Sequence, residues 1–375
     1  MTRRETYLDW NATAPLRPEA MSAVAAALAE CGNPSSVHCW GRAARQRVER
    51  AREAVAALAA APADSVVFTS GGTEANHLAL AGTGRDRIFV SAVEHSSVLQ
   101  AAPAARMIPV DRNGIVDLAW LEAALAADRS PATVSVQYAN NETGVLQPVA
   151  AIAEIAHRYG ALFHCDVVQA AGKLPFNIRS IGANLLSLSA HKLGGPTGIG
   201  ALIVAGATEI APTIRGGGQE HGHRAGTENL PGIAGFAAAA EAAVAEIGTY
   251  NRVAKLRDRL EAATLAAVPD AVIVCAAAPR LPNTTALALP GLAAETQVIA
   301  LDLDGVMVSA GAACSSGKVG PSHVLAAMAV PPKLAQATIR VSLGWSTAEN
   351  DVDHFLGVWT ALARRRSSRP GVRAA

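Results

Sequence analysis

The sequence predicts an α/β fold with a mostly parallel sheet. Seven short apolar segments between residues 66 and 204 have the length and composition of buried strands, and helical patterns separate most of them. Such alternation is typical of parallel sheets with crossover helices. The chain has 375 residues, of which 50% are hydrophobic, so it can bury a large core divided between a large and a small domain.

Local sequence patterns predict the helices and strands of the first two thirds of the chain. Residues 1–15 are predicted to be an irregular arm, and Pro18 opens a helix that ends at Glu30, before Gly32. A second helix is expected over 41–60. Strands are expected at 66–69, 87–91, 106–110, 133–138, 161–165, 183–188 and 199–204, with helices at 75–81, 118–127 and 149–159.

The last third of the chain predicts a smaller α+β unit. A long helix at 231–247 precedes this unit, and helices at 253–267 and 348–363 are expected at its start and end. Between them lie strand candidates at 271–274, 284–289, 306–309 and 338–342. We therefore expect a large domain over 16–250 and a small domain that combines 1–15 with 251–375.

Composition narrows the functional classes. Lys and Arg number 32 and Asp and Glu 31, and this net charge of +1 gives no sign of a nucleic-acid footprint. No leader-type segment is evident, and no apolar run reaches the roughly 18 residues of a membrane span. We expect a cytoplasmic protein without a membrane or nucleic-acid partner. The five scattered cysteines form no C-x-x-C pair, so neither a disulfide framework nor a metal site is expected.

Polar side chains follow two of the predicted strands. Asp166 and Gln169 come after 161–165, and Ser189, His191 and Lys192 come after 183–188. The carboxyl ends of parallel strands line the ligand crevice of such sheets. An acid facing a ring nitrogen and a lysine that forms a Schiff base are the two contacts that pyridoxal phosphate needs.

The same residues also have ordinary structural interpretations. Asp166 and Ser189 could be helix caps, and Lys192 could be a solvated loop residue. However, Lys192 lies among small residues directly after an apolar segment, where an unpaired ammonium would be costly. The combination therefore favours a functional site.

Other strand ends add candidates. Gly72 and Thr73 lie in a glycine-rich turn before a helix, where backbone amides favour an anion, although a plain turn is the alternative. His95 could stack on a flat cofactor and move protons, or belong to a helix-capping segment. Asn141 could bind a phenolic oxygen or substrate, although adjacent asparagines are common in turns.

Two residues of the predicted small domain complete the set. Cys314 lies in a stretch of small residues, where a thiolate could be exposed and act as a nucleophile; an inert loop thiol is the alternative. Arg340 interrupts an apolar strand and needs a partner. That partner is either a substrate carboxylate gripped bidentately or an internal salt bridge.

Taken in order, these motifs resemble the cysteine desulfurases, in the class V aminotransferase group of fold-type-I pyridoxal phosphate enzymes. The resemblance implies a seven-stranded, mostly parallel sheet in the large domain. The matching motifs extend through nearly the whole chain, and their order makes them specific. They lie at 7–9, 11–15, 32–36, 69–74, 94–95, 140–144, 164–169, 189–192, 224–227, Cys314 and 339–344.

The resemblance implies a role for each matching residue in holding pyridoxal 5'-phosphate. Lys192 would hold the cofactor covalently and move the substrate proton, and Asp166 would keep the pyridine nitrogen protonated. Gln169 and Asn141 would contact the ring oxygen side, and His95 would stack on the ring and serve in proton transfer. The phosphate would be held by Gly72, Thr73, Ser189 and His191, with Thr227 from the neighbouring subunit of a homodimer.

The resemblance also implies the reaction. Asn33 and Arg340 would bind the carboxylate of L-cysteine, and Cys314 would take the sulfur as a persulfide, leaving alanine. An acceptor for iron–sulfur cluster assembly or tRNA thiolation would then receive the sulfur. The alternatives are a selenocysteine lyase, an aminotransferase that does not use Cys314, and a scaffold without turnover; intact Asp166, Lys192 and Cys314 argue against the last.

Overall fold

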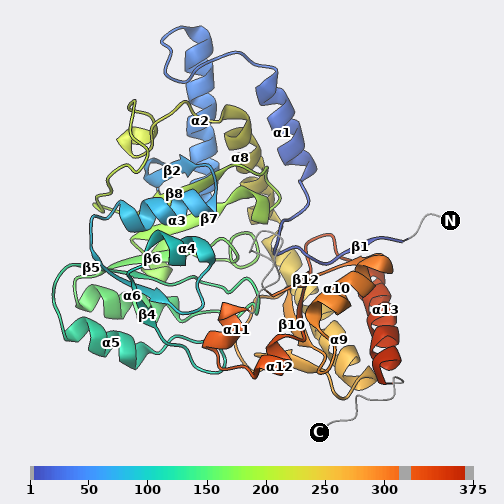
Figure 1. The fold of residues 1–375 in the computed structure, drawn as a ribbon. Helices are drawn as coiled ribbons and strands as arrows, with labels where there is room; N and C mark the ends of the chain where they lie inside the picture. The colour runs from blue at the N-terminus through green and yellow to red at the C-terminus, as the bar shows by residue number, and fades with distance from the viewer. Residues whose placement is uncertain (1–3, 312–321, 368–375) are drawn as a thin grey trace.

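The computed structural model describes residues 4–311 and 322–367 and divides their strands among a seven-stranded, a four-stranded and a two-stranded sheet. Figure 1 shows the large sheet with α1, α2 and α8 above it and the smaller unit below and to one side. The predicted α/β fold class is confirmed.

The large sheet has the strand order β2-β8-β7-β6-β5-β3-β4. Its strands are β2 (Val66–Thr69), β3 (Arg87–Ser91), β4 (Arg106–Ile108), β5 (Ala132–Ser135), β6 (Leu162–Asp166), β7 (Leu185–Ser189) and β8 (Gly200–Val204). All neighbouring pairs from β7 to β4 are parallel, whereas β8 runs antiparallel to both β7 and β2. The carboxyl ends of β3, β5, β6 and β7 therefore share one edge of the sheet.

Helices cover both faces of this sheet because its strands are apolar on both sides. Leu186 and Leu188 of β7 join the core that also contains Val55 and Phe236, whereas Leu185 packs on the opposite face with Leu78. The helices are α1 (Pro18–Leu28), α2 (Cys39–Ala57), α3 (Gly72–Ala81), α4 (Ser96–Ala101), α5 (Leu118–Ala126), α6 (Val149–Arg158), α7 (Ile178–Ile181) and α8 (Leu230–Ala245).

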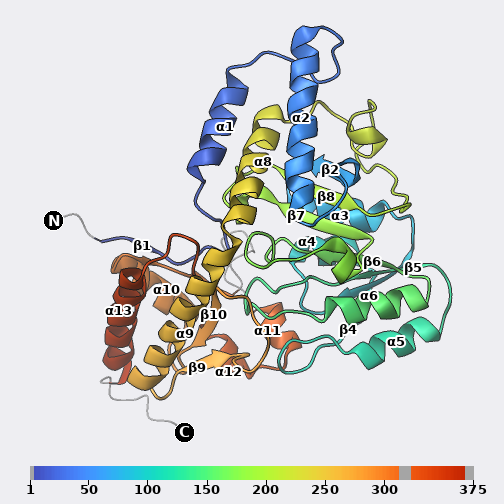
Figure 2. The ribbon, with the colours of Figure 1, turned by 180° about the vertical axis from the view of Figure 1, so that it is seen from behind.

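The smaller unit has a separate core, in which Phe355 and Trp359 are fully buried. Its antiparallel sheet has the order β12-β13-β10-β9. The strands are β9 (Val272–Val274), β10 (Thr284–Ala288), β12 (Ser309–Ala310) and β13 (Thr338–Ser342), and the helices are α9 (Tyr250–Ala267), α10 (Ala294–Leu303), α11 (His323–Ala327), α12 (Pro332–Ala335) and α13 (Glu349–Ser367). Figure 2 shows α8 running toward α9, so these helices link the two units.

The expectation of an irregular N-terminal arm is wrong in part. Residues of β1 (Thr6–Tyr7) pair in parallel with β11 (Val306–Met307), and Asp9 forms a bridge with Ser342 of β13. The first residues thus attach to the smaller unit, in line with the expected grouping of 1–15 with 251–375. The boundaries of that division stay a prediction.

The other expectations hold to within a few residues. The strands at 66–69, 87–91 and 338–342 are found as predicted. The single strand expected at 306–309 is divided between β11 and β12, which belong to different sheets, and α10 lies where no helix is predicted. Within residues 4–311 and 322–367, no single helix could cross a membrane by length and composition; α8 together with 247–267 could, but they meet at a 56° bend.

A buried ion pair holds the loop before α8 against β2. Arg52 Nη1 donates to Glu220 Oε2 at 2.7 Å, and the same oxygen accepts the backbone N–H of Phe68 at 2.8 Å. Both side chains of the pair are at most 3% exposed. Removing one partner of such a pair leaves the other charge buried and uncompensated.

We therefore expect Glu220→Ala to lower the free energy of unfolding by about 3–5 kcal/mol, because it leaves the buried Arg52 guanidinium without its counterion. Glu49→Ala is the matched control: Glu49 lies 3.5 Å from the same arginine but is 51% exposed, so its loss costs at most about 1 kcal/mol. Urea unfolding of the two variants measures both. Equal effects would contradict the assigned importance of Glu220.

Candidate active site

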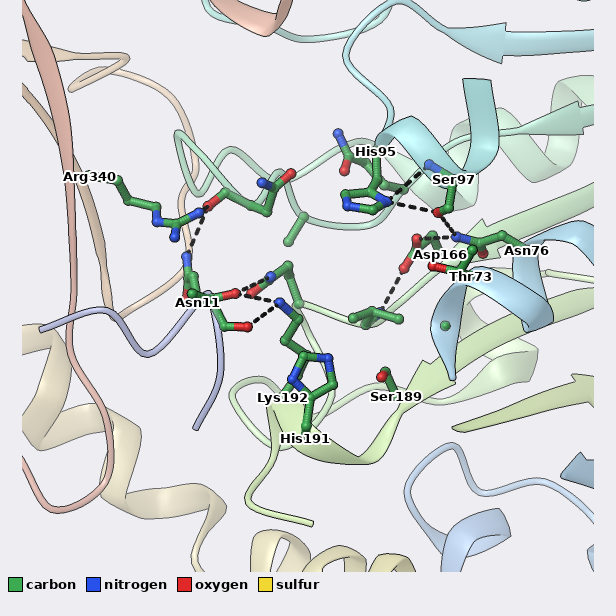
Figure 3. A pocket seen from close by; sticks show the side chains of 17 residues that line it. Asn11, Thr73, Asn76, His95, Ser97, Asp166, Ser189, His191, Lys192 and Arg340 are labelled. Carbon is green, nitrogen blue, oxygen red and sulfur yellow. Dashed lines mark hydrogen bonds between the residues drawn. The ribbon is translucent and has the colours of Figure 1, made fainter. Parts of the chain in front are cut away.

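A cavity of about 350 Å³ lies at the carboxyl ends of the parallel strands, where the large unit meets the N-terminal arm and β13 (Figure 3). It brings together most of the residues singled out in the sequence. Those lining it are Gly72, Thr73, His95, Asn141, Asp166, Gln169, Ser189, His191, Lys192 and Arg340.

Asp166 places a carboxylate in the cavity. It is the last residue of β6, and its side chain is 7% exposed. Oδ1 accepts the backbone N–H of Val168 at 2.9 Å, and Oδ2 accepts Nδ2 of Asn76 on α3, also at 2.9 Å. The expected helix cap is not found, because turns rather than a helix follow β6 and Asp166 accepts the N–H of Val168 within one of them. A functional role for Asp166 stays compatible with its geometry.

Lys192 ends a short 3-10 turn, Ala190–Lys192, directly after β7. Its Nζ donates to the backbone carbonyls of Asn11 and Ala12, at 2.7 and 2.8 Å. The amine is therefore held at the cavity by the N-terminal arm rather than solvated. Sequence reasoning gave Asn11 no role, although it lay within one of the matching motifs.

The N-terminus of α3 faces the cavity with Gly72 and Thr73. A Cβ on Gly72 would lie 3.1 Å from Val168 Cγ2, so only glycine fits without displacing that side chain. Within the described residues, the hydroxyls of Thr73 and Ser189 form no hydrogen bond. Free hydroxyls beside the amides of a helix N-terminus suit an anion such as phosphate.

His191 also lines the cavity. Burial, assisted by the positive charges of Lys192 and Lys173, lowers the pKa of His191 to about 4. A neutral imidazole results at pH 7, which can donate one hydrogen bond.

Gln169 is oriented by a lysine that the sequence did not single out. Lys173 Nζ donates to Gln169 Oε1 at 2.8 Å, and Gln169 Nε2 donates to the Asn11 carbonyl at 3.0 Å. Lys173 is 2% exposed. Burial, then the charges of Lys192 and Arg340, lower its pKa well below the usual value.

The capping interpretation of His95 is confirmed, and its functional role stays a prediction. It is the N-cap of α4, where its Nδ1 accepts the backbone N–H of Ser97 at 3.1 Å, and its ring also lines the cavity. Burial lowers the pKa of His95; the charges of Lys192 and His323 act in the same direction and that of Asp166 opposes them.

Arg340 forms the internal salt bridge that was one of its two interpretations. Nη2 donates to Asp9 Oδ1 at 2.7 Å and Nη1 to the Asn141 carbonyl at 3.1 Å. Its Nε has no hydrogen-bond partner in the part of the chain that the structure describes. The guanidinium lines the cavity, so the internal pair leaves a substrate role open.

Three predicted residues are not among the lining residues. Asn33 is exposed, and its Oδ1 accepts the backbone N–H of Ser35 at 2.9 Å. Thr227 is exposed in the loop before α8. Cys314 lies outside the described residues. The roles of all three stay predictions.

Comparisons with known proteins show the family to which the chain belongs. The family model for aminotransferase class-V matches residues 6–355. The chain belongs to this family. One relative is a cysteine desulfurase of Cereibacter sphaeroides, which is 47% identical over 367 residues; the match covers 94% of each chain. Another is cysteine desulfurase IscS of Dictyoglomus turgidum, which is 41% identical; the match covers 95% of this chain and 94% of the relative.

Solved structures extend the comparison to the fold. A NifS-like protein from Rickettsia africae superposes with a TM-score of 0.89 at 37% sequence identity. The match covers 96% of this chain and 100% of that protein. The resemblance to the cysteine desulfurases, inferred from the motifs, is confirmed.

His164 supports the site from inside the sheet. It is fully buried on β6, with Nδ1 2.8 Å from Ser135 Oγ and Nε2 2.9 Å from Ser187 Oγ. Burial lowers the pKa of His164 to about 3. The folded chain thus keeps this ring neutral where the unfolded chain, with a pKa near 6.5, takes up a proton.

Only the unfolded chain takes up this proton between about pH 6.5 and 3. His164 therefore lowers the free energy of unfolding as the pH falls through this range, by up to about 1.4 kcal/mol per pH unit. We expect His164→Gln to flatten this part of the pH dependence, even if it lowers stability at pH 7. Urea unfolding across this range measures the two slopes. Parallel curves would contradict a neutral buried His164.

Proposed function

We propose that the protein is a pyridoxal 5'-phosphate-dependent cysteine desulfurase that passes the sulfur of L-cysteine to Cys314 and leaves alanine. The observation that carries this proposal is the shared cavity of Asp166 and Lys192, with a helix N-terminus on one side and Arg340 on another. Membership of the family, with cysteine desulfurases as full-length relatives, supports it.

The donor set fits the cofactor. Asp166 would face the pyridine nitrogen, Gln169 and Asn141 would serve the ring oxygen, and Lys192 supplies the amine. The phosphate would be held by Gly72, Thr73, Ser189 and His191. When bound, pyridoxal phosphate supplies an electron sink that stabilises negative charge next to the substrate's α-carbon.

The side chains of this chain would divide the remaining tasks. The Lys192 amine, released from the carbonyls of Asn11 and Ala12, can take up or give back the proton at the α-carbon. Arg340 can bind the substrate carboxylate in place of, or together with, Asp9. Exposed Asn33 contributes to carboxylate binding only if another segment or chain places it there.

The attachment of the Cys314 segment supports the sulfur-transfer step. On one side of it, a Cβ on Gly311 would lie 2.7 Å from Glu142 Oε2; on the other, Ser322 Oγ donates to the same oxygen at 2.6 Å. Glu142 directly follows the lining residue Asn141. Three residues of chain span at most about 11 Å, so Gly311 tethers the thiol within reach of this region.

We further propose a cytoplasmic homodimer and a sulfur-accepting partner, such as an iron–sulfur scaffold. The exposed Thr227 would then contribute to the phosphate site of the second chain. The Arg52–Glu220 pair fixes the preceding part of the Thr227 loop against β2. This attachment supports a defined position for Thr227 at the surface.

Two variants together test the proposal. Lys192→Ala should lose both the visible absorption of the lysine-linked cofactor and all sulfide release. Cys314→Ala should keep the absorption, because Asp166 and Lys192 remain, but its sulfide release should fall to background. Absorption spectra and a sulfide assay with L-cysteine measure both effects.

Native sulfide release by Cys314→Ala would contradict the persulfide role, and mass spectrometry of the wild type after incubation with cysteine should find the added sulfur on Cys314. An enzyme that releases selenide or transfers amino groups without Cys314 would instead be a selenocysteine lyase or an aminotransferase.

Arg340→Ala should raise the KM for cysteine about 10- to 100-fold, which corresponds to the loss of a charge-assisted hydrogen bond to the carboxylate. Arg340→Lys, which keeps the charge but not the planar fork, should fall between this variant and the wild type. Steady-state kinetics provide the test, and an unchanged KM in Arg340→Ala would exclude the carboxylate role.

A further inference from the structure

A directed chain of hydrogen bonds joins Asp166 to His95 through two residues to which the sequence assigned no role (Figure 3). Asn76 Nδ2 donates to Asp166 Oδ2 at 2.9 Å and to Ser97 Oγ at 2.8 Å. Both hydrogens of this amide are thereby used. If the Asn76 amide were turned over, its oxygen would face the Asp166 carboxylate, so the carboxylate sets the orientation of the amide.

The same direction continues to the imidazole. Ser97 Oγ accepts from Asn76, so its own hydrogen is available to Nδ1 of His95, 2.8 Å away. The backbone N–H of Ser97 donates to this nitrogen as well, at 3.1 Å. A backbone N–H can only donate, so Nδ1 must be an acceptor, and the proton of a neutral ring must be on Nε2.

We propose that Ser97 is a positioning residue that holds His95 as the neutral tautomer protonated on Nε2, so that His95 presents a hydrogen-bond donor, not a base, to the cavity. The tautomer follows from this chain's own contacts. Its catalytic consequence rests on the proposed function: proton abstraction falls to Lys192, and His95 orients and stabilises.

The groups around His95 favour the neutral form. The charge of Asp166 at the end of β6 favours a second proton on the ring, whereas burial and the charges of Lys192 and His323 disfavour it. The adjacent Glu94 is fully buried, and burial raises its pKa well above the usual value, so it supplies little negative charge. A proton on Nδ1 would, in addition, face the Ser97 N–H directly.

The Ser97 hydroxyl is well suited to a specific test because a matched control lies beside it. Ser97 is 6% exposed and bonded to two partners, whereas the neighbouring Ser96 is exposed. Ser97→Ala removes the hydroxyl and leaves the backbone N–H in place. Ser96→Ala makes the same chemical change outside the hydrogen-bond chain.

The experiment is nitrogen-15 NMR of cofactor-free protein labelled in histidine, with His95→Gln to assign the signals. In the wild type, Nδ1 of His95 should have the shift of an unprotonated ring nitrogen and Nε2 that of a protonated one. In Ser97→Ala, the pH midpoint for protonation of His95 should rise by about half to one unit, because one hydrogen bond to Nδ1 is lost.

Ser96→Ala should keep the wild-type midpoint, and Ser97→Thr, which retains a hydroxyl, should restore it. In the loaded enzyme, the acid limb of the pH profile of sulfide release should move with the NMR midpoint. A protonated Nδ1 in the wild type, or an unmoved midpoint in Ser97→Ala, would overturn the proposal. The NMR measurement needs no turnover, so it tests the tautomer of His95 separately from the proposed desulfurase activity. Absence of that activity would not change the NMR result.

Discussion

The need to stabilise one buried carboxylate connects the parts of this site. An ionised group with little solvent contact requires donors, and Asp166 obtains them from the turn after β6 and from Asn76 on α3. The first donor ties the carboxylate to the end of a central strand, and the second ties it to a helix whose N-terminus faces the same cavity. The acid and the N-terminus of α3 therefore keep a fixed relative position.

Three basic side chains lie in or beside the same cavity. They belong to Lys173, Lys192 and Arg340, and Arg340 is paired directly with Asp9. Lys173 and Lys192 are instead satisfied by oxygens of neutral groups, several of them backbone carbonyls. Burial lowers the pKa of Lys173 well below its usual value, so Lys192 and Arg340 are the basic groups that suit a ligand with a phosphate or a carboxylate.

Sequence patterns predicted the features that local chemistry and topology determine. Apolar strands define the sheet, and the rule that ligands lie at carboxyl strand ends selected Asp166 and Lys192. The patterns did not reveal Asn76, Ser97 or Lys173, because their roles depend on partners brought close by the fold. Asn76 is 90 residues from Asp166, and nothing in a lone asparagine on a helix predicts that contact. The sequence likewise predicts an irregular N-terminal arm, since a two-residue strand such as β1 has no detectable period.

Several interpretations that the sequence presents as alternatives coexist in the structure, and this coexistence has chemical meaning. His95 caps α4, and that cap is what commits its Nδ1 as an acceptor and leaves the ring proton on Nε2. Arg340 is paired with Asp9, so a substrate carboxylate would exchange one anion for another rather than neutralise a bare cation. Asp9 belongs to the same arm whose carbonyls hold the Lys192 amine. Under the proposed function, a substrate carboxylate at Arg340 and release of the Lys192 amine would both act on this short segment, so substrate binding could affect the lysine through it.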